Sequence, residues 1–445
     1  MSNVSHKLGR DPIYDLNQIS IPRRLILGLQ HCFAMFGATI LVPLITGLNI
    51  QTTLLMAGLG TLLFHLLTKG KVPAFLGSSF AFIGGYAAVA PKLADGSSNV
   101  EKLAYASGGV MIAGLVYLLI AGLIKVFSIE RVMSFFPPVV TGPIIMAIGL
   151  TLTPAAIGNA SQDWLLAGIA ILIIVLCNIW GKGMFQILPI LIGISVTYVI
   201  AILLNRVDFA PLSQSAIVGL PLHPQNFARF DLSAIITIVP ITLATIMEHV
   251  GDISAIGATV GKNFVADPGL HRTLMGDGLA TTLAAAVGAP ANTTYGENTG
   301  VLVLTKVYDP KVMRIAACFA IGLSFFPVIA NAISSIPAGI IGGISMVLYG
   351  MITAIGGRNL VENRVDLSKS RNLLIVASIL ILALGFPKGV SFHIGQLPIT
   401  LSGLALASLV GIILNAIFPG KDYHFTSEKP QATGVEFSGT HPVQD

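Results

Sequence analysis

The sequence Asn-Thr-Thr-Tyr-Gly-Glu-Asn-Thr-Gly at residues 292–300 interrupts a long apolar stretch. Within it, Glu297 is the only charged residue between Asp277 and Lys306. Ionisable residues at membrane depth are costly, and they are rare outside functional sites. We therefore expect Glu297 to belong to a binding site that is built from irregular backbone inside a membrane.

The composition is that of a polytopic membrane protein. Of 445 residues, 54% are hydrophobic and only 10% are charged, whereas a typical soluble domain has about 25% charged residues. The mean hydropathy is +0.84. Residues 1–22 are polar and lack the pattern of a cleavable signal. The three cysteines lie in apolar segments without metal-ligand spacing, so we expect no bound metal, no cofactor and no nucleic-acid partner.

A membrane-spanning helix needs about 20 apolar residues. The candidate segments are 25–46, 52–68, 80–91, 105–124, 135–154, 164–181, 185–204, 233–251, 273–289, 298–307, 312–331, 337–355, 372–387 and 399–418. Segments 80–91 and 298–307 are too short to cross alone, and each follows a polar stretch that contains Pro and Gly. We expect an all-α polytopic protein with about 14 segments, in which these two are half-helices that each follow a short extended strand.

The distribution of basic residues tests this map. With the N-terminus on the cytoplasmic side, 20 of the 25 Lys and Arg residues fall on that side. The other basic residues are Lys92, Lys102, Arg206, Arg229 and Lys388. The positive-inside rule predicts such a bias, and one missed span would destroy it. We therefore expect both termini to be cytoplasmic and the chain to lie in the cytoplasmic (inner) cell membrane.

Two short matches relate the halves of the chain. Residues 72–80 align with 289–297 at a shift of 217, and Gln30-His31 aligns with Glu248-His249 at a shift of 218. Seven spans separate the copies, and because seven is odd the halves are expected to lie in opposite orientations. Such inverted repeats are typical of secondary transporters. The resulting units are a cytoplasmic segment 1–22, a first seven-segment repeat 23–204, an external loop 205–232, a second repeat 233–418 and a cytoplasmic tail 419–445.

Interrupted helices in matching positions of two repeats point to a substrate site. Irregular backbone at membrane depth has to satisfy its own hydrogen-bonding groups. We expect residues 75–79 and 292–296 to pair as a short ladder, followed by half-helices that start near Phe80 and near Glu297. Helix N-termini present free N–H donors and a partial positive charge, so both starts are expected to face the ligand.

Glu248 precedes Asp252 by four residues, which puts both on one helix face. Gly77 and Gly296 are expected to let a ligand approach the backbone closely. Backbone donors and glutamate acceptors together suit a small planar molecule that carries N–H and C=O groups, such as uracil, and they disfavour anions such as urate. A channel suits this arrangement less well than alternating access, and only Gly276-Asp277-Gly278 hints at an intramembrane aspartyl protease.

Several motifs carry a resemblance to a known family. They are Gln30-His31, the run from Glu297-Asn298-Thr299-Gly300 to Thr305-Lys306, Phe75–Phe82 and Tyr295–Asn298. On these motifs, the chain resembles the nucleobase–ascorbate transporter (nucleobase:cation symporter-2) family over residues 22–420. Within that family it is most similar to the bacterial uracil permeases.

This resemblance implies a transporter rather than an enzyme, which imports uracil by proton symport and alternating access. A core domain (23–127 and 233–331) would carry the substrate past a gate domain (133–204 and 337–418), within a homodimer in the lipid bilayer. Two alternatives stay open. The substrate could be another nucleobase such as xanthine or thymine, and the coupling ion could be sodium.

The resemblance also implies roles for individual residues. Glu248 and Glu297 would accept the ring N–H groups, and the backbone N–H groups of Phe80 and Gly296 would donate to the carbonyls. The residues expected to line or support the pocket are Ser79, Tyr295, Asn298 and Tyr349. Those expected at or behind the proton-coupling site are Glu248, Glu297, Asp252, His249, His31 and Tyr349. The simpler interpretation of both histidines is packing, and that of Asp277 is capping of a helix start.

Overall fold

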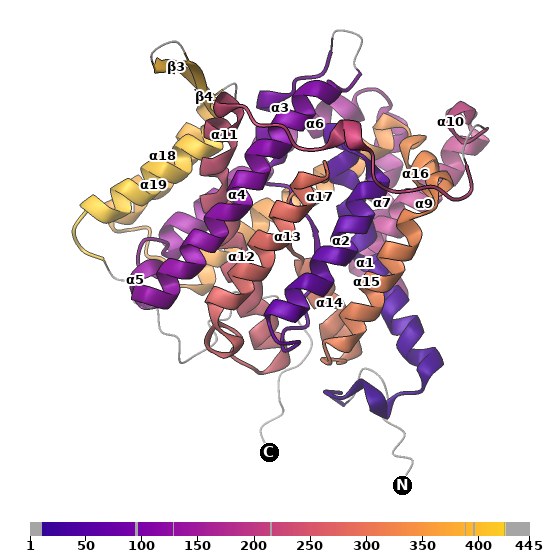
Figure 1. Cartoon of the computed structure of the whole chain (residues 1–445), viewed down its shortest axis with the longest axis horizontal. Coiled ribbons are helices and arrows are strands. Elements are labelled where there is room, and N and C mark those ends of the chain that lie inside the picture. The colour runs from indigo at the N-terminus through magenta and orange to yellow at the C-terminus, as the bar shows by residue number, and fades with distance from the viewer. Residues whose placement is uncertain are drawn as a thin grey trace.

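The computed structural model describes residues 11–93, 97–127, 129–213, 216–387, 389–394, 397–421 and 423. It is a bundle of helices (Figure 1). The first half contains η1 (Leu16–Gln18), α1 (Ile21–Thr46), α2 (Ile50–Leu67), β1 (Leu76–Ser78), α3 (Ile83–Val89), α4 (Val100–Phe127), α5 (Ile129–Met133), α6 (Pro138–Ala160), α7 (Trp164–Trp180), α8 (Met184–Ile187), α9 (Pro189–Leu203) and α10 (Ala210–Ser213). The second contains η2 (Pro224–Asn226), α11 (Leu232–Ile238), η3 (Val239–Ile241), α12 (Thr242–Val260), η4 (Val265–Gly269), α13 (Leu270–Ala286), β2 (Asn292–Thr294), α14 (Gly296–Thr305), α15 (Lys311–Ser324), α16 (Pro327–Ser334), α17 (Ala338–Glu362), α18 (Ser370–Gly385), β3 (Val390–Ile394), β4 (Leu397–Leu401) and α19 (Gly403–Ile417).

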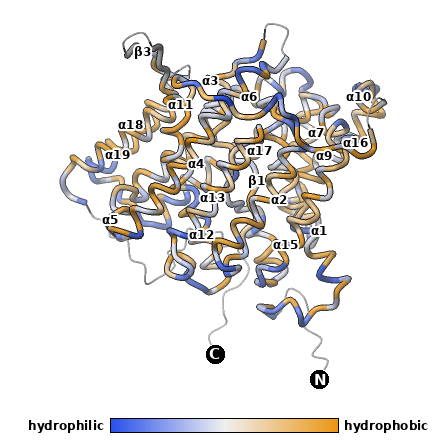
Figure 2. Tube along the Cα trace, in the orientation of Figure 1, coloured by the Kyte–Doolittle hydropathy of each residue, from blue (hydrophilic) through white to orange (hydrophobic). Residues whose placement is uncertain are grey.

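The hydropathy of the helices fits a membrane. Among the described residues, 6 helices are long and apolar enough to cross one, or up to 7 if α15 and α16 form one bent span. The helices α7, α9, α18 and α19 are apolar but shorter. Figure 2 shows hydrophobic residues along the helices and hydrophilic residues concentrated towards the two ends of the bundle.

A helix occupies all or part of each predicted segment, but some segments are less regular than expected. The predicted span 312–331 is the pair α15 and α16, bent by 84°. The prediction of helix at the start of segment 399–418 is wrong, because residues 397–401 form β4, which pairs with β3 in an unpredicted hairpin. The run Val-Ser-Phe-His-Ile before it is rich in β-branched and aromatic residues, which favour strands.

The predicted ladder is present at the centre of the bundle. Strands β1 and β2 pair antiparallel, with Leu76 opposite Thr294, Gly77 opposite Thr293 and Ser78 opposite Asn292. The ladder is lengthened at both ends, where Ser79 N–H donates to Ala291 O at 2.9 Å and Tyr295 N–H donates to Phe75 O at 3.0 Å. The two segments thus satisfy much of each other's backbone, as a membrane interior requires.

Threonines from two neighbouring helices satisfy the outer edges of this ladder. Thr61 Oγ1 in α2 accepts the N–H of Leu76 at 2.9 Å, and Thr281 Oγ1 in α13 donates to the carbonyl of Asn292 at 2.7 Å. Asn292 also donates from its side chain to Met56 O in α2, at 2.9 Å. Thr61 therefore accepts a backbone N–H of β1, whereas Thr281 donates to a backbone carbonyl of β2, and α2 contacts both strands.

The half-helices differ slightly from expectation at their starts. Helix α14 begins at Gly296, one residue before Glu297. Helix α3 begins at Ile83 rather than near Phe80, because the Phe80 carbonyl accepts the N–H of Ile83 at 3.1 Å in an intervening turn. Phe80 therefore lies in the turn between strand and helix.

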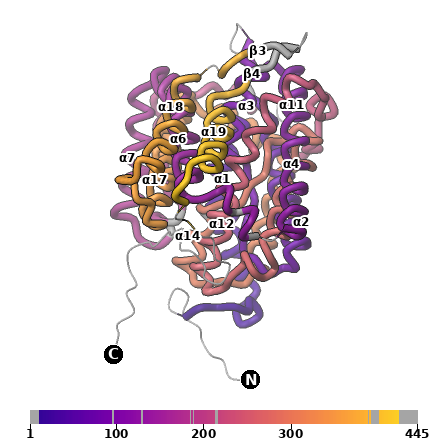
Figure 3. The backbone as a smooth tube through the Cα atoms, turned by 90° about the vertical axis from the view of Figure 1, so that its left-hand side faces the viewer, coloured from indigo at the N-terminus to yellow at the C-terminus, as the bar shows by residue number. Residues whose placement is uncertain are grey.

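The longer helices separate into two groups around the ladder. Figure 3 shows α7, α17 and α18 towards one side, and α2, α4 and α11 towards the other. Helices α6 and α17 approach closely, since a Cβ added at Gly149 would lie 2.3 Å from Tyr349 O. Such contacts through small residues are typical of packing in membranes. Figure 1 shows the indigo segment that precedes α1 at one end of the molecule and β3 and α3 at the other; we call the end with this segment, which contains η1, the N-terminal face.

Candidate substrate site

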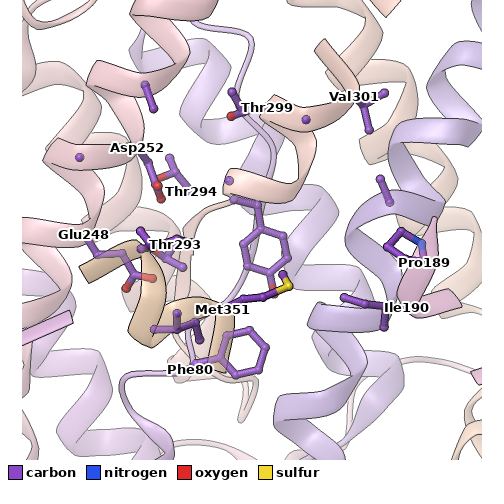
Figure 4. A pocket seen from close by; sticks show the side chains of 18 of the residues that line it. Phe80, Pro189, Ile190, Glu248, Asp252, Thr293, Thr294, Thr299, Val301 and Met351 are labelled. Atoms are coloured by element: carbon purple, nitrogen blue, oxygen red, sulfur yellow. The ribbon is translucent and has the colours of Figure 1, made fainter. Parts of the chain in front are cut away.

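A cavity of about 260 Å³ lies between the ladder and the group of helices that contains α7 and α17. Its walls come from α1, α12, α14 and the ladder on one side, and from α6, α7, α8, α9 and α17 on the other. Figure 4 shows Glu248 and Asp252 across the cavity from Pro189 and Ile190, with Phe80 near its base in this view. The site therefore has two carboxylates on one wall, and the part of the other wall that faces them in this view carries the apolar residues Pro189 and Ile190.

Helix α12 turns one face to the cavity. Glu248, Gly251, Asp252 and Ala255 all line it, which is the i, i+3, i+4, i+7 pattern of a single helix face. Both carboxylates are half-buried. Asp252 lies within α12, eight residues before its last residue Val260, rather than at the helix end.

Helix α14 meets the cavity with its N-terminus. Gly296 is its first residue and lines the cavity, as do Thr299 and Gly300 one turn further on. Among the described residues, a Cβ added at Gly296 would meet only Asp252 Oδ1 within 4 Å, at 3.9 Å, so the backbone here is open to a ligand. Glu297 is the second residue of α14, and its side chain lies outside the part that the structure describes.

Gly77 has a different role from the one expected. A Cβ added at Gly77 would lie 2.5 Å from the ring of Tyr295 and 2.6 Å from Thr39 Oγ1. The missing side chain therefore makes room for Tyr295, not for a ligand. The hydroxyl of Tyr295 donates to Ser78 O at 2.9 Å, and this bond fixes the ring where it lines the cavity.

Phe80 lines the cavity, and Tyr349 lies behind it. The two rings meet edge to face, with centroids 6.2 Å apart and planes at 78°. Tyr349 is buried in α17, on the other side of the cavity from the ladder. Ser79 is also buried, and its backbone belongs to the end of the ladder. Of these three residues, only Phe80 is part of the cavity wall.

Asn298 and His31 are brought together behind the site. The Asn298 side chain donates to the His31 carbonyl at 3.1 Å and lies 3.3 Å from His31 Nδ1. Both residues are buried, and neither lines the cavity. Their contact joins α14 to α1, so it supports the half-helix that carries Gly296 and Glu297.

A chain of polar side chains leads from the cavity into the protein. Asp252 Oδ2 accepts a hydrogen bond from the Thr294 hydroxyl at 3.2 Å, and that hydroxyl lies 3.4 Å from His249 Nδ1. His249 Nδ1 in turn lies 3.4 Å from Asp277 Oδ2, and both side chains are fully buried. The interpretation of Asp277 as a cap is wrong, because α13 begins seven residues earlier, at Leu270.

Sequence reasoning missed the opposite end of the cavity. Arg358 and Glu362 in α17 line it there, with Asn178 from α7. Arg358 Nε donates to Glu362 Oε1 at 2.5 Å, an i, i+4 pair. The spacing of the pair was visible in the sequence, but nothing in it indicated that this face of α17 meets α7 and the cavity.

The comparisons with known proteins identify the family. The Permease family model (Xan_ur_permease) matches residues 23–392. The chain belongs to this family. It is 39% identical over 406 residues to the probable uracil permease of Pasteurella multocida, with 89% of this chain and 94% of that protein covered. It is 38% identical over 424 residues to the uracil permease of Bacillus caldolyticus, with 92% and 95% covered.

Family membership confirms the expected resemblance to nucleobase–ascorbate transporters and shows that the chain is a permease, not an enzyme. Together with its apolar helices, it makes the chain a multi-pass membrane protein. Among solved structures, the transmembrane domain of a cyanobacterial bicarbonate transporter, BicA, matches with a TM-score of 0.59 at 15% identity, over 91% of this chain and 99% of that one. That likeness concerns the fold alone.

Proposed function

We propose that this permease imports uracil across the cytoplasmic membrane by proton symport and alternating access. The observation that carries the proposal is the pairing of two carboxylates on one face of α12 with the open backbone of Gly296, inside one cavity. Relatives named as uracil permeases, 38–39% identical over most of the chain, support the choice of substrate.

The binding mode follows from donor and acceptor chemistry. Glu248 and Glu297 would accept the two ring N–H groups of uracil, and the backbone N–H groups of Gly296 and Phe80 would donate to its carbonyls. Hydrogen bonds to charged groups contribute about 1.5–3 kcal/mol each. A site that needs N–H donors in the ligand rejects anions that offer only acceptors.

The proposed architecture has fourteen segments in two inverted repeats, 23–204 and 233–418. Each half contributes one short strand followed by one short helix, β1 with α3 and β2 with α14, and the two strands pair with each other, which favours this symmetry. We assign 23–127 and 233–331 to a moving core and 133–204 and 337–418 to a gate. In this arrangement the termini are cytoplasmic, the N-terminal face is the cytoplasmic face, and the permease is a homodimer.

Proton coupling would use the same carboxylates. Protonation of Glu248 or Glu297 removes a charge whose transfer past the apolar gate is unfavourable, so it favours movement of the loaded core. The chain from Asp252 through Thr294 and His249 to Asp277 provides closely spaced polar groups beside this site.

The experiment is uptake of labelled uracil by cells that lack their own uracil carrier. The Glu248→Ala and Glu297→Gln variants should abolish accumulation at normal levels of protein in the membrane. Phe227→Ala, an exposed residue distant from the cavity lining, is the matched control and should retain uptake. Uptake retained by either glutamate variant contradicts the site assignment, and stronger competition by unlabelled xanthine or thymine than by uracil contradicts the choice of substrate.

A further inference from the structure

Ile13, in the segment that precedes α1, makes an isolated β-bridge on the N-terminal face. The N–H of Ile13 donates to Lys306 O at 2.8 Å, and the N–H of Tyr308 donates to Ile13 O at 2.8 Å. These two bonds make a parallel bridge between Ile13 and Val307. Ile13 is 1% exposed and Val307 is fully buried. The segment around Ile13 is thus paired to the linker that leaves α14.

Tyr14 connects the same segment to the end of α12. Its hydroxyl donates to the carbonyl of Val260, the last residue of α12, at 3.0 Å. Its ring lies 5.4 Å from the ring of Tyr308, and Lys262 Nζ lies 5.1 Å from its centroid. One side chain therefore contacts the segments that follow α12 and α14.

Asp309 anchors the next residues of the segment. This nearly buried carboxylate accepts the N–H of Leu16 at 2.7 Å and the N–H of Lys311 at 2.9 Å. Lys311 Nζ lies 3.4 Å from Asp15 Oδ1. The backbone N–H of Asn17 donates to Asp15 and lowers the pKa of that carboxyl, so it is anionic opposite Lys311 at neutral pH.

We propose that residues 13–16, which we call the N-terminal clamp, position the substrate site by holding the ends of α12 and α14 together. The proposal rests on the proposed function. Helix α12 carries Glu248 and Asp252, and α14 carries Gly296 and Glu297. Both helices end at the clamp, at Val260 and Thr305. All its partners belong to the proposed core, so the clamp stays docked while the core moves.

The length of α14 explains why it needs this support. It has only 10 residues and follows a strand of 3 residues, so neither element is long enough to fix its tilt. At 1.5 Å per residue, α14 is about 15 Å long, and a small tilt at its clamped end displaces Gly296 at the other. Loss of the clamp should therefore raise the Kd for the ligand clearly while it lowers the Tm of the ligand-free protein only slightly.

The test measures uracil affinity and thermal stability of the purified full-length permease in parallel. Tyr14 is 49% exposed, so its replacement leaves the core packed. We expect Tyr14→Ala to raise the Kd for uracil at least tenfold with a ligand-free Tm close to that of the unaltered protein. Tyr14→Phe keeps the ring contacts and should restore most of the affinity. Phe227→Ala removes an exposed aromatic side chain elsewhere and should leave the Kd unchanged. An unchanged Kd for Tyr14→Ala overturns the proposal.

A disulfide tests whether the clamp stays docked. Bridged positions such as 13 and 307 lie within the Cα separation that a disulfide spans. Ile13→Cys with Val307→Cys, in a background whose three native cysteines are replaced by alanine, should be as active when oxidised as when reduced. Loss of uptake on oxidation, recovered by reduction, would show that the clamp has to open and would overturn the proposal.

If the proposed function is wrong, the unaltered protein will not bind uracil. This result can be distinguished from an error in the clamp proposal, which concerns only the difference between the unaltered protein and Tyr14→Ala. In that case the clamp is judged from the distance between spin labels at Ala258→Cys in α12 and Val303→Cys in α14. The clamp predicts that Tyr14→Ala broadens this distance distribution. An unchanged distribution contradicts it, whatever the ligand is.

Discussion

The hydroxyl of Thr294 in β2 donates a hydrogen bond to Asp252 Oδ2 in α12, across 3.2 Å. The same hydroxyl lies 3.4 Å from His249 Nδ1, so Thr294 joins a carboxylate in the cavity wall to a buried histidine. The central ladder is therefore more than a frame for the two half-helices. It also supplies a side chain that links the cavity to His249 and Asp277.

Thr294→Val removes this hydroxyl and keeps the shape of the side chain. A hydrogen bond to a charged group contributes about 1.5–3 kcal/mol, so we expect the link between Asp252 and His249 to be lost and the pH dependence of uptake to change. Thr294→Ser keeps the hydroxyl and should behave like the unaltered protein. The measurement is the initial rate of uracil uptake across pH 5–8. Identical pH profiles for the valine and serine variants would argue against any part of Thr294 in coupling.

The two glycines of the ladder region should respond differently to the same change. In Gly77→Ala the new Cβ meets the Tyr295 ring at 2.5 Å, and overpacking of this kind costs about 1–3 kcal/mol. In Gly296→Ala the Cβ meets only Asp252 Oδ1, at 3.9 Å. We expect the first variant to lower the Tm and the second to keep the Tm but weaken uracil binding. Equal effects of both on Tm would contradict these assignments.

The sequence was sufficient to predict the central features of the fold. Pro, Gly and polar residues in otherwise apolar surroundings, repeated at one offset, predicted the ladder of 75–79 with 292–296. The spacing of Glu248 and Asp252 predicted their shared face. These signals are local, because each depends on residues that are close in sequence or on a direct match between two segments.

The features that sequence reasoning missed depend on long-range packing. Asp277 lies beside His249, 28 residues earlier in the sequence, and that contact depends on how α12 and α13 pack. The fit of Gly77 against Tyr295 requires the register of the ladder. Similarly, the position of Arg358 in the cavity wall depends on which face of α17 turns towards it. No pattern along the chain specifies these relationships.

Arg358 and Glu362 line the cavity from α17, and replacement of Arg358 should affect uracil binding less than replacement of Glu248. The Arg358–Glu362 pair is only partly buried, with side chains 34% and 23% accessible, and i, i+4 pairs on helices stabilise by about 0.3–0.5 kcal/mol, so we expect Arg358→Ala to fold. We expect its Kd for uracil to stay within about twofold, while Glu248→Ala weakens binding by about tenfold or more, the loss of one charge-assisted hydrogen bond. Titration calorimetry on both purified variants makes the comparison. Weaker binding in Arg358→Ala than in Glu248→Ala would indicate that uracil binds near Arg358 and would contradict the proposed site at Glu248.

Phe80→Leu removes the edge-to-face contact with the Tyr349 ring but keeps the backbone N–H that is proposed to meet a uracil carbonyl. Aromatic pairs of this kind contribute about 0.5–1.5 kcal/mol beyond the area they bury. We therefore expect a modest increase in the Kd for uracil and retained accumulation in cells. Abolished accumulation at normal expression would assign the essential role to the ring of Phe80 instead of its backbone.

Accumulation of labelled uracil by the purified permease in sealed liposomes is the decisive measurement. With an inward proton gradient and no sodium, uracil should concentrate inside the liposomes, and a protonophore should abolish the gradient of uracil. Accumulation that follows an imposed sodium gradient but ignores the proton gradient, or no accumulation of uracil under either gradient, would contradict proton-coupled uracil import.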